Sequence, residues 1–318
     1  MMSRVVLVSS HQFGSRALRG FVSSEAHRAG ELEIALLVGE PPKEGSSSRR
    51  YASLRRQARE LGVRYLETTD GTLQSNAALI QSVEPDYVLV VGWQRLVSMN
   101  VLNIPRQLHH ASARHGSAHG CIGMHPTMLP FGRGMSPIPR TILSGLWESG
   151  LSVFLLEDVA DAGGIVFQLP LAIPSEADAS RLFAAFAALH ERAGQILATT
   201  LAGRALTARP QDLSASKVWR PLRTADGRIE FSRPGEEIVR LVRALTEPYP
   251  GAHFDYAGDT VTVQACTFIP ASATALCGTI VAVDECGLPV IAVADGLIHV
   301  TSCTGGAPGG FHVGSKAN

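Results

Sequence analysis

The sequence predicts an α/β protein with two domains: a Rossmann-like, mostly parallel sheet at the N-terminus and a smaller, OB-like β-barrel at the C-terminus. Apolar runs rich in β-branched residues alternate with segments of helical length through the first two-thirds of the chain. After residue 203 the pattern changes to short stretches in which apolar and polar residues alternate. The 318 residues also exceed the usual size of one domain. We therefore expect domains at 1–203 and 204–318.

Four apolar runs are expected to form strands of the N-terminal sheet. They cover residues 5–8, 34–38, 87–91 and 153–156. The helix-length segments between them predict a parallel sheet with helices on both faces. The turn at 9–14 lacks Gly-x-Gly-x-x-Gly, the pattern that cradles a dinucleotide, so NAD is not expected.

Two helices have clear signals in this part of the chain. Apolar residues at helical spacing from Leu18 to Ala29 predict a helix that Gly30 closes. A capping box at 175–178 predicts the start of a long helix that reaches Leu201 and completes the first domain.

The C-terminal third has the pattern of a small barrel. A polar linker at 210–216 precedes it, and strands are expected at 260–264, 279–283 and 290–293. The five cysteines of the chain are scattered and form no Cys-x-x-Cys pair, so we expect reduced and mostly buried thiols.

The charge balance bears on the partners of the protein. The chain carries 28 basic and 28 acidic residues, so no overall field draws it to nucleic acid or to an anionic membrane. Residues 203–318 contain 10 Lys or Arg and 11 Asp or Glu, a net charge of −1, which disfavours tRNA as a partner. No apolar stretch approaches the ~18 residues that span a bilayer, so we expect a cytoplasmic protein with no membrane partner. The sequence leaves a homodimer open.

A histidine and an aspartate are the candidate catalytic pair. His125 ends a short apolar stretch and precedes a proline, and Asp161 follows 36 residues later at the head of a Gly-rich loop. An imidazole titrates near neutral pH and is the commonest general base, and a carboxylate that orients it is its usual companion. We expect a fold to bring these two side chains together.

The residues around this pair resemble the formyltransferase family that uses 10-formyltetrahydrofolate, which includes methionyl-tRNA formyltransferase and the amino-sugar N-formyltransferases. Residues 123–130 read Gly-Met-His-Pro-Thr-Met-Leu-Pro, where the family has Asn-x-His-x-Ser-Leu-Leu-Pro. Gly-Arg-Gly at 132–134 and Asp-Ala-Gly-Gly at 161–164 follow, similar to the family's Arg-Gly and Asp-x-Gly-Asp segments. Further similar segments lie at 4–8, 85–93, 227–231 and 243–252.

The resemblance implies a reaction and a set of site residues. A primary amine would attack the formyl carbon of 10-formyltetrahydrofolate, or of a related one-carbon tetrahydrofolate, with His125 as general base and Asp161 as its partner. The folate contacts implied by the family lie on two loops: Trp93, Gln94, Arg95, Leu96, Asp158 and Val159. The substrate contacts expected with less support are Thr127, Arg133 and His115.

One position departs from the family pattern. The family has an asparagine that donates a hydrogen bond to the formyl oxygen, and this chain has Gly123 there. A missing donor of this kind costs ~2.7–4 kcal/mol of transition-state stabilisation. A backbone N–H, a water in the vacated space, protonated His125 or Gln94 are the alternatives. We expect restoration of the asparagine to lower activity, because glycine adopts backbone angles that are closed to asparagine.

Residues 106–120 contain four histidines within eleven residues: His109, His110, His115 and His119. No acidic residue or cysteine accompanies them and the spacing fits no fixed site, so no metal is expected. A loop over the acceptor pocket and an inert surface loop are the two interpretations.

The function that these observations favour is N-formylation of a small-molecule amine, with an amino sugar or an aminoglycoside-like compound as acceptor. Three alternatives are transfer of a formimidoyl group from a formimidoyl-folate, formylation of methionyl-tRNA, and a folate-binding protein that has lost catalysis. Retention of both His125 and Asp161 disfavours the last.

Overall fold

The computed structural model describes residues 2–42, 50–105, 120–203, 206–272, 275–306 and 309–318. Its contacts divide the chain into two units. The first comprises Met1–Pro137, Glu148–Ala172 and Ala184–Trp219, and the second comprises Ile138–Trp147, Ile173–Phe183 and Arg220–Asn318. Two short segments of the first two-thirds of the chain therefore group with the second unit. A division at residue 203 stays a prediction for the folding domains.

The first unit contains a seven-stranded sheet with the order β3-β2-β1-β4-β5-β7-β8. Its strands are β1 Ser3–Val8, β2 Leu32–Gly39, β3 Tyr65–Glu67, β4 Tyr87–Val91, β5 Cys121–His125, β7 Glu148–Leu155 and β8 Ile165–Ala172. The pairs from β3 to β5 are parallel. The α/β fold class and the mostly parallel sheet are thus confirmed.

The strand expected at 153–156 lies in β7, which runs antiparallel to β5 and to β8. Ser152 of β7 lies opposite His125, the last residue of β5. The chain leaves the sheet at the C-terminal end of β5 and re-enters it beside that same end. The strand β7 therefore runs in the opposite direction to β5. A separate pair of strands, β6 Phe131–Gly134 and β9 Lys217–Trp219, is parallel.

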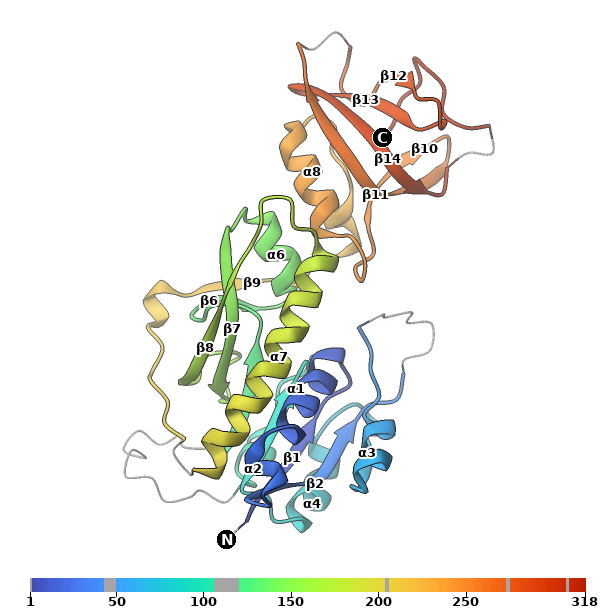
Figure 1. Ribbon diagram of the computed structural model, residues 1–318. Helices are drawn as coiled ribbons and strands as arrows, with labels where there is room; N and C mark the ends of the chain where they lie inside the picture. The colour runs from blue at the N-terminus through green and yellow to red at the C-terminus, as the bar shows by residue number, and fades with distance from the viewer. Residues whose placement is uncertain (1, 43–49, 106–119, 204–205, 273–274, 307–308) are drawn as a thin grey trace. The chain divides into compact units, whose positions relative to one another are not determined.

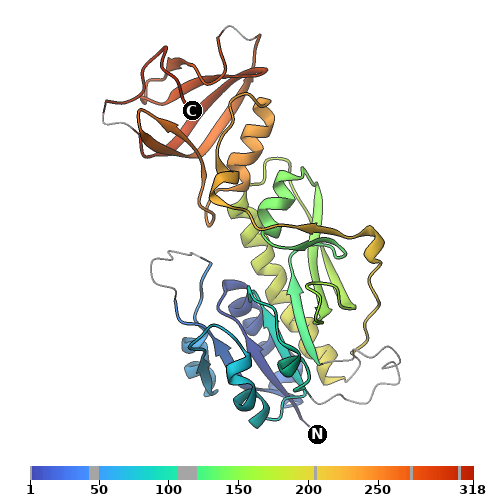
Figure 2. The ribbon, with the colours of Figure 1, turned by 180° about the vertical axis from the view of Figure 1, so that it is seen from behind.

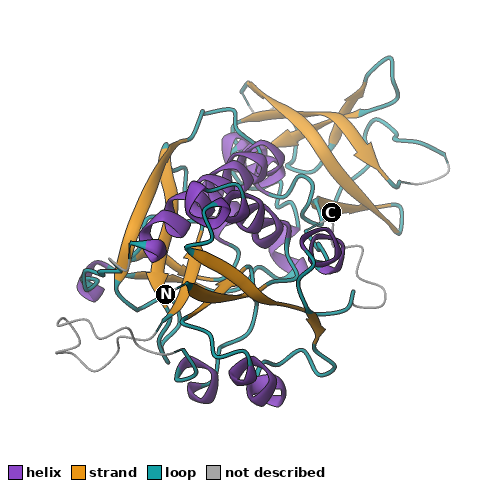
Figure 3. Ribbon diagram, turned by 60° about the horizontal axis from the view of Figure 1, so that its bottom comes forward, coloured by secondary structure: helices purple, strands orange, loops and turns teal. Residues whose placement is uncertain are grey.

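Helices cover both faces of the large sheet (Figure 3). The helices α1 (Gln12–Val22), α2 (Glu25–Arg28) and α7 (Ala179–Ala202) lie on the face seen in Figure 1. The helices α4 (Ala77–Ser82) and α5 (Met99–Leu102) lie on the face seen in Figure 2, where Ile80, Val101 and Leu102 pack on strand valines. A further helix, α3, spans Arg55–Leu61.

Helices α1 and α7 cross closely because each has a glycine at the contact. A Cβ atom on Gly20 would lie 1.8 Å from the Glu191 carbonyl oxygen, and one on Gly194 would lie 2.1 Å from that of Ala17. Any larger side chain would push the helices apart. The crossing keeps the first turn of α1 beside the middle of α7.

Both helix predictions need correction at their boundaries. The helix expected to run from Leu18 to Ala29 ends at Val22, because Ser24 accepts the His27 N–H through its hydroxyl and starts the separate helix α2. The long helix begins at Ala179 under a cap from Asp178, whose Oδ1 accepts the Arg181 N–H at 2.8 Å. The capping box expected from Ser175 is wrong, since its hydroxyl bonds Glu176 instead.

The second unit is a small antiparallel barrel with the strand order β10-β11-β14-β13-β12. The strands are β10 Ala252–Tyr256, β11 Asp259–Pro270, β12 Ile280–Val283, β13 Pro289–Val293 and β14 Gly296–Thr304. The chain end joins the two sheet edges. Asn318 exchanges backbone hydrogen bonds with Asp255 of β10, and Ser315 accepts one from Ile280 of β12. The barrel strands expected at 260–264, 279–283 and 290–293 are confirmed.

The helix α8 (Gly235–Ala244) accompanies the barrel strands and buries Ile238 and Val242 in the barrel core. A further helix, α6, spans Pro137–Leu143. Over the part of the chain that the structure describes, no helix has both the length and the apolar character of a membrane span. The five cysteines are free, but only Cys121 is buried, so the expectation of mostly buried thiols is wrong.

Candidate functional site

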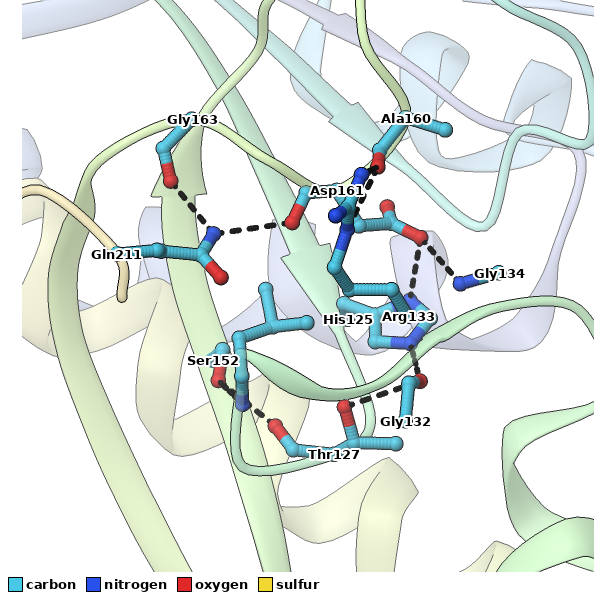
Figure 4. Close-up of polar contacts among 11 residues, drawn as sticks. His125, Thr127, Gly132, Arg133, Gly134, Ser152, Ala160, Asp161, Gly163 and Gln211 are labelled. Atoms are coloured by element: carbon cyan, nitrogen blue, oxygen red, sulfur yellow. Dashed lines mark hydrogen bonds and ion pairs between the residues drawn. The ribbon is translucent and has the colours of Figure 1, made fainter. Parts of the chain in front are cut away.

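His125 is the last residue of β5 and is 7% exposed. The tight turn after it is held from the neighbouring strand. Ser152 of β7 donates its hydroxyl to the Thr127 carbonyl at 2.7 Å and accepts the Leu129 N–H at 3.0 Å. The turn brings the Gly132 carbonyl oxygen to 2.8 Å from His125 Nε2 (Figure 4).

This contact determines which imidazole nitrogen is free. A carbonyl oxygen only accepts hydrogen bonds, so Nε2 must carry the proton. In the neutral ring, Nδ1 therefore holds the lone pair, and it lies 3.7 Å from Asp161 Oδ2. The Gly132 contact thus commits Nε2 and leaves the Nδ1 lone pair facing the Asp161 carboxylate.

The loop that carries Asp161 is held by several polar contacts (Figure 4). Asp161 has a φ of +54°, a left-handed conformation that is uncommon outside glycine. Its Oδ2 accepts the Gly134 N–H at 2.8 Å. Arg133 donates to the preceding carbonyl, that of Ala160, from Nε at 3.1 Å and from Nη2 at 2.6 Å. Leu156, at the start of this loop, donates its N–H to the carbonyl of Cys121, the first residue of β5, whereas the Asp161 carboxylate lies beside the side chain of His125, the last residue of β5.

The residues expected to contact substrate lie differently. Arg133 is 8% exposed, and beyond Ala160 its remaining contact goes to the Ser216 hydroxyl at 3.3 Å. Thr127 is buried and donates its hydroxyl to the Gly132 carbonyl at 3.3 Å. These contacts favour support of the turn and the loop over direct contact with substrate. His115 and the histidine-rich segment lie outside the described residues.

Trp219 was not singled out by sequence patterns, yet it packs on β6, whose Gly134 N–H donates to Asp161. Its ring and backbone pack on the glycines of β6. A Cβ atom on Gly134, whose φ is +94°, would lie 2.4 Å from the Trp219 carbonyl oxygen. Ser152 was also missed, although a hydroxyl within the apolar run 151–156 was a usable signal.

Gly123 lies in β5 with its Cβ position already occupied. A Cβ atom there would meet Leu156 Cδ2 at 2.7 Å and the Phe154 ring at 3.0 Å. Its backbone is ordinary strand and not left-handed, so the expected backbone reason for glycine is wrong. Apolar side chains fill the space that the family's asparagine would take, which disfavours a water donor at that point.

The two loops expected to hold folate border one apolar cluster. Trp93 and Val97, after β4, and Leu156, after β7, pack against the same buried residues. Gln94, Arg95 and Leu96 are exposed, as are Asp158 and Val159. Within the described residues, the backbone N–H and C=O groups of 93–97 make no hydrogen bond. Apolar side chains next to backbone donors and acceptors of this kind fit a flat heteroaromatic ring such as a pteridine.

Two other histidines, His190 and His11, are poor candidates for the base. Burial lowers the pKa of His190 to about 4, with a smaller lowering from the neighbouring His125. Burial also lowers the pKa of His11 to about 3, with smaller contributions from Arg50 and His190. Both rings are therefore neutral near pH 7 and resist protonation.

The fold and this site define a protein of the α/β class in which a buried histidine, at the end of a sheet strand, faces an aspartate on a neighbouring loop. The chain belongs to the formyl transferase family. The family's model, described as formyl transferase, matches residues 4–200, and the model described as formyl transferase, C-terminal domain, matches residues 221–306. Members of this family are enzymes that transfer formyl groups.

Curated relatives share the whole length of the chain. The methionyl-tRNA formyltransferase of Ectopseudomonas mendocina is 27% identical over 312 residues, which cover 97% of this chain and 92% of the relative. That of Chloroflexus aurantiacus is 28% identical over 294 residues, covering 91% and 87%.

Solved structures share the fold. The sugar 3N-formyl transferase WlaRD, determined with dTDP and 5-N-formyl-THF, has a TM-score of 0.65 at 13% identity and covers 94% of this chain and 98% of its own. An N-formyltransferase from Helicobacter canadensis, in complex with folinic acid and dTDP-3-aminofucose, has a TM-score of 0.64 at 13% identity, with 96% and 100% covered.

Proposed function

We propose that this protein is an N-formyltransferase that moves the formyl group of 10-formyltetrahydrofolate to the primary amine of a small molecule, with an amino sugar as the favoured acceptor. One observation carries the chemistry: Nδ1 of His125 is the unprotonated nitrogen of the neutral ring and faces the Asp161 carboxylate. Family membership supports the donor, and the apolar side chains of Trp93 and Leu156 suit a pteridine.

The residues of the pair have separate tasks in this reaction. Bound folate supplies an activated formyl carbon next to the amine. As the amine nitrogen bonds to that carbon, Nδ1 of His125 accepts the amine proton. The Asp161 carboxylate stabilises the resulting imidazolium, and the same proton then passes to the folate nitrogen as its bond to the formyl carbon breaks. Over one cycle the proton lost by the amine is gained by the folate nitrogen, so protons and charge balance.

The acceptor class rests on charge. The whole chain is neutral, and residues 203–318 carry a net charge of −1 from 10 basic and 11 acidic residues. Binding of a polyanion depends on many unpaired Lys and Arg side chains, whereas a small amine does not. Assay of purified protein with 10-formyltetrahydrofolate and a panel of nucleotide-linked amino sugars, with product masses as readout, tests the proposal.

Formylation of methionyl-tRNA is the second candidate, because the curated relatives described above carry that name. We predict weak binding of initiator tRNA, with less than a tenfold change in affinity between 50 and 200 mM salt. A protein that neutralises 6–10 phosphates would lose about 10³–10⁵ over that range. Filter binding measures this, with the Ectopseudomonas mendocina enzyme as positive control. Tight, salt-sensitive binding together with formylation of methionyl-tRNA would replace the small-molecule proposal.

The change Gly123→Asn is predicted to lower formyl transfer at least tenfold, because Leu156 and Phe154 occupy the space that the amide needs. Gly123→Ala is the matched control. Its single Cβ can be accommodated by a shift of the partly exposed Leu156 side chain, so a much smaller effect is expected. A tenfold gain from Gly123→Asn alone would show that the site lacks only the missing donor.

A further inference from the structure

Gln211 joins two carbonyl groups of the Asp161 loop. Its Nε2 donates to the Asp161 carbonyl at 2.9 Å and to the Gly163 carbonyl at 2.7 Å (Figure 4). Both N–H groups of one side-chain amide are therefore used on either side of Ala162. Gln211 lies between residues 200 and 221, a stretch that neither family model matches.

The backbone on each side of Gln211 is itself anchored. Arg209 exchanges two backbone hydrogen bonds with Ile165, the first residue of β8, at 2.8 and 2.9 Å. Asp212 accepts the Ser214 N–H and caps the short 3₁₀ turn Leu213–Ala215. The amide is thus presented from a segment fixed on both sides, and not from a free loop.

The arrangement leaves one polar atom of Gln211 unsatisfied. Its Oε1 is buried and has no hydrogen-bond partner among the described residues. A buried, unpaired amide oxygen is unfavourable, and an apolar side chain of similar size would avoid it. Such a side chain would leave two loop carbonyls without donors. The two N–H contacts are therefore the feature that a glutamine provides here.

The loop needs such contacts because Asp161 is in the left-handed region, with a φ of +54°. Non-glycine residues hold this conformation only where their surroundings over-determine it. Arg133 holds the carbonyl before Asp161, and the Gly134 N–H holds its carboxylate. Gln211 donates to the carbonyls of Asp161 and of Gly163.

We infer that Gln211 is a positioning residue for formyl transfer, which keeps the Asp161 carboxylate beside His125 by holding the carbonyls of Asp161 and Gly163. The inference rests on the proposed function of that pair. Loss of the two contacts lets the loop relax toward an ordinary backbone conformation, and the carboxylate moves away from Nδ1. A displacement of about 1 Å at a reacting group can cost 10²-fold in rate.

The test is kinetic and uses the full-length protein. Gln211→Ala is expected to lower kcat about 10–100-fold and to change the KM for folate and for the amine less than threefold. In an Asp161→Asn background the same change should lower kcat less than twofold, because Gln211 acts through Asp161. Gln195→Ala is the matched control, since that amide bonds Ser23 on the exposed side of α7, and it should leave kcat unchanged. Equal losses in both backgrounds, or an unchanged kcat in Gln211→Ala, would overturn the inference.

A second measurement does not depend on turnover. Hydrogen–deuterium exchange of residues 159–164 should become at least tenfold faster in Gln211→Ala, while exchange of β5 stays the same. Gln211→Glu keeps the side-chain shape but replaces the donating NH₂ group with a carboxylate oxygen, which cannot donate to the two carbonyls. It should give the same result. Unchanged exchange in both variants means that Gln211 does not hold the loop. Faster exchange with a fully active Asp161→Asn variant would instead refute the proposed role of Asp161.

Discussion

Replacing His125 with alanine is expected to reduce formyl transfer by about 10²–10⁴-fold, the usual effect of losing a general base. The reason is geometric: Nε2 is committed to the Gly132 carbonyl, and Nδ1 is the nitrogen that faces Asp161. Neither His11 nor His190 can substitute, because desolvation lowers their pKa values to about 3 and about 4. Steady-state kcat with 10-formyltetrahydrofolate and the acceptor amine is the measurement.

His299→Ala is the matched control for this variant. His299 also pairs with an aspartate, Asp284, at 2.8 Å, but it lies in the barrel. It should leave kcat unchanged. Thermal melting and circular dichroism of both variants check that the fold is retained. If His125→Ala turned over at a rate near that of the natural protein, another group would have to be the base.

Removal of the Asp161 carboxylate is expected to have an effect of the same order, about 10²–10⁴-fold in kcat. Asp161→Asn keeps an oxygen that can accept the Gly134 N–H, now 2.8 Å from Oδ2, so the loop keeps its shape and only the charge is lost. Asp161→Ala loses the charge and that hydrogen bond together, and should be at least as slow.

The two variants separate the roles of Asp161. If the charge is what matters, Asp161→Asn and Asp161→Ala should lie within about tenfold of each other, both far below the natural protein. Asp284→Asn, in the barrel, controls for the loss of one carboxylate from a histidine pair. High activity in Asp161→Asn with loss only in Asp161→Ala would assign Asp161 a purely structural role.

Much of the fold was predictable because its signals are local. The apolar runs at 34–38 and 87–91 alternate with segments of helical length, and this alternation alone indicates a mostly parallel sheet with helices packed on its faces. The direction of a strand within the sheet could not be predicted from its local sequence. The antiparallel course of β7 depends on the chain re-entering the sheet opposite His125, which no pattern within 148–155 encodes.

Helix boundaries were predicted less well than helices. Periodicity ran through Ser23 and Ser24 without a break, but the Ser24 hydroxyl found a local backbone partner and started a new helix. The same competition placed the cap of the long helix at Asp178 instead of Ser175. Single side-chain hydrogen bonds decide such boundaries, and apolar spacing does not record them.

At the site, the sequence by itself indicated the candidate catalytic pair by residue type and order: a histidine before a proline turn and an aspartate on a Gly-rich loop. Only the tertiary structure decided how the two side chains are arranged. The proton on Nε2, the filled space at Gly123 and the hold of Gln211 on the Asp161 loop all come from contacts made by folding. Gln211 and Asp161 are 50 residues apart, and a hydrogen bond over that separation exists only once the packed chain brings its ends together. Local sequence patterns show which side chains can react, whereas the distances and hydrogen bonds between them are set only in the folded chain.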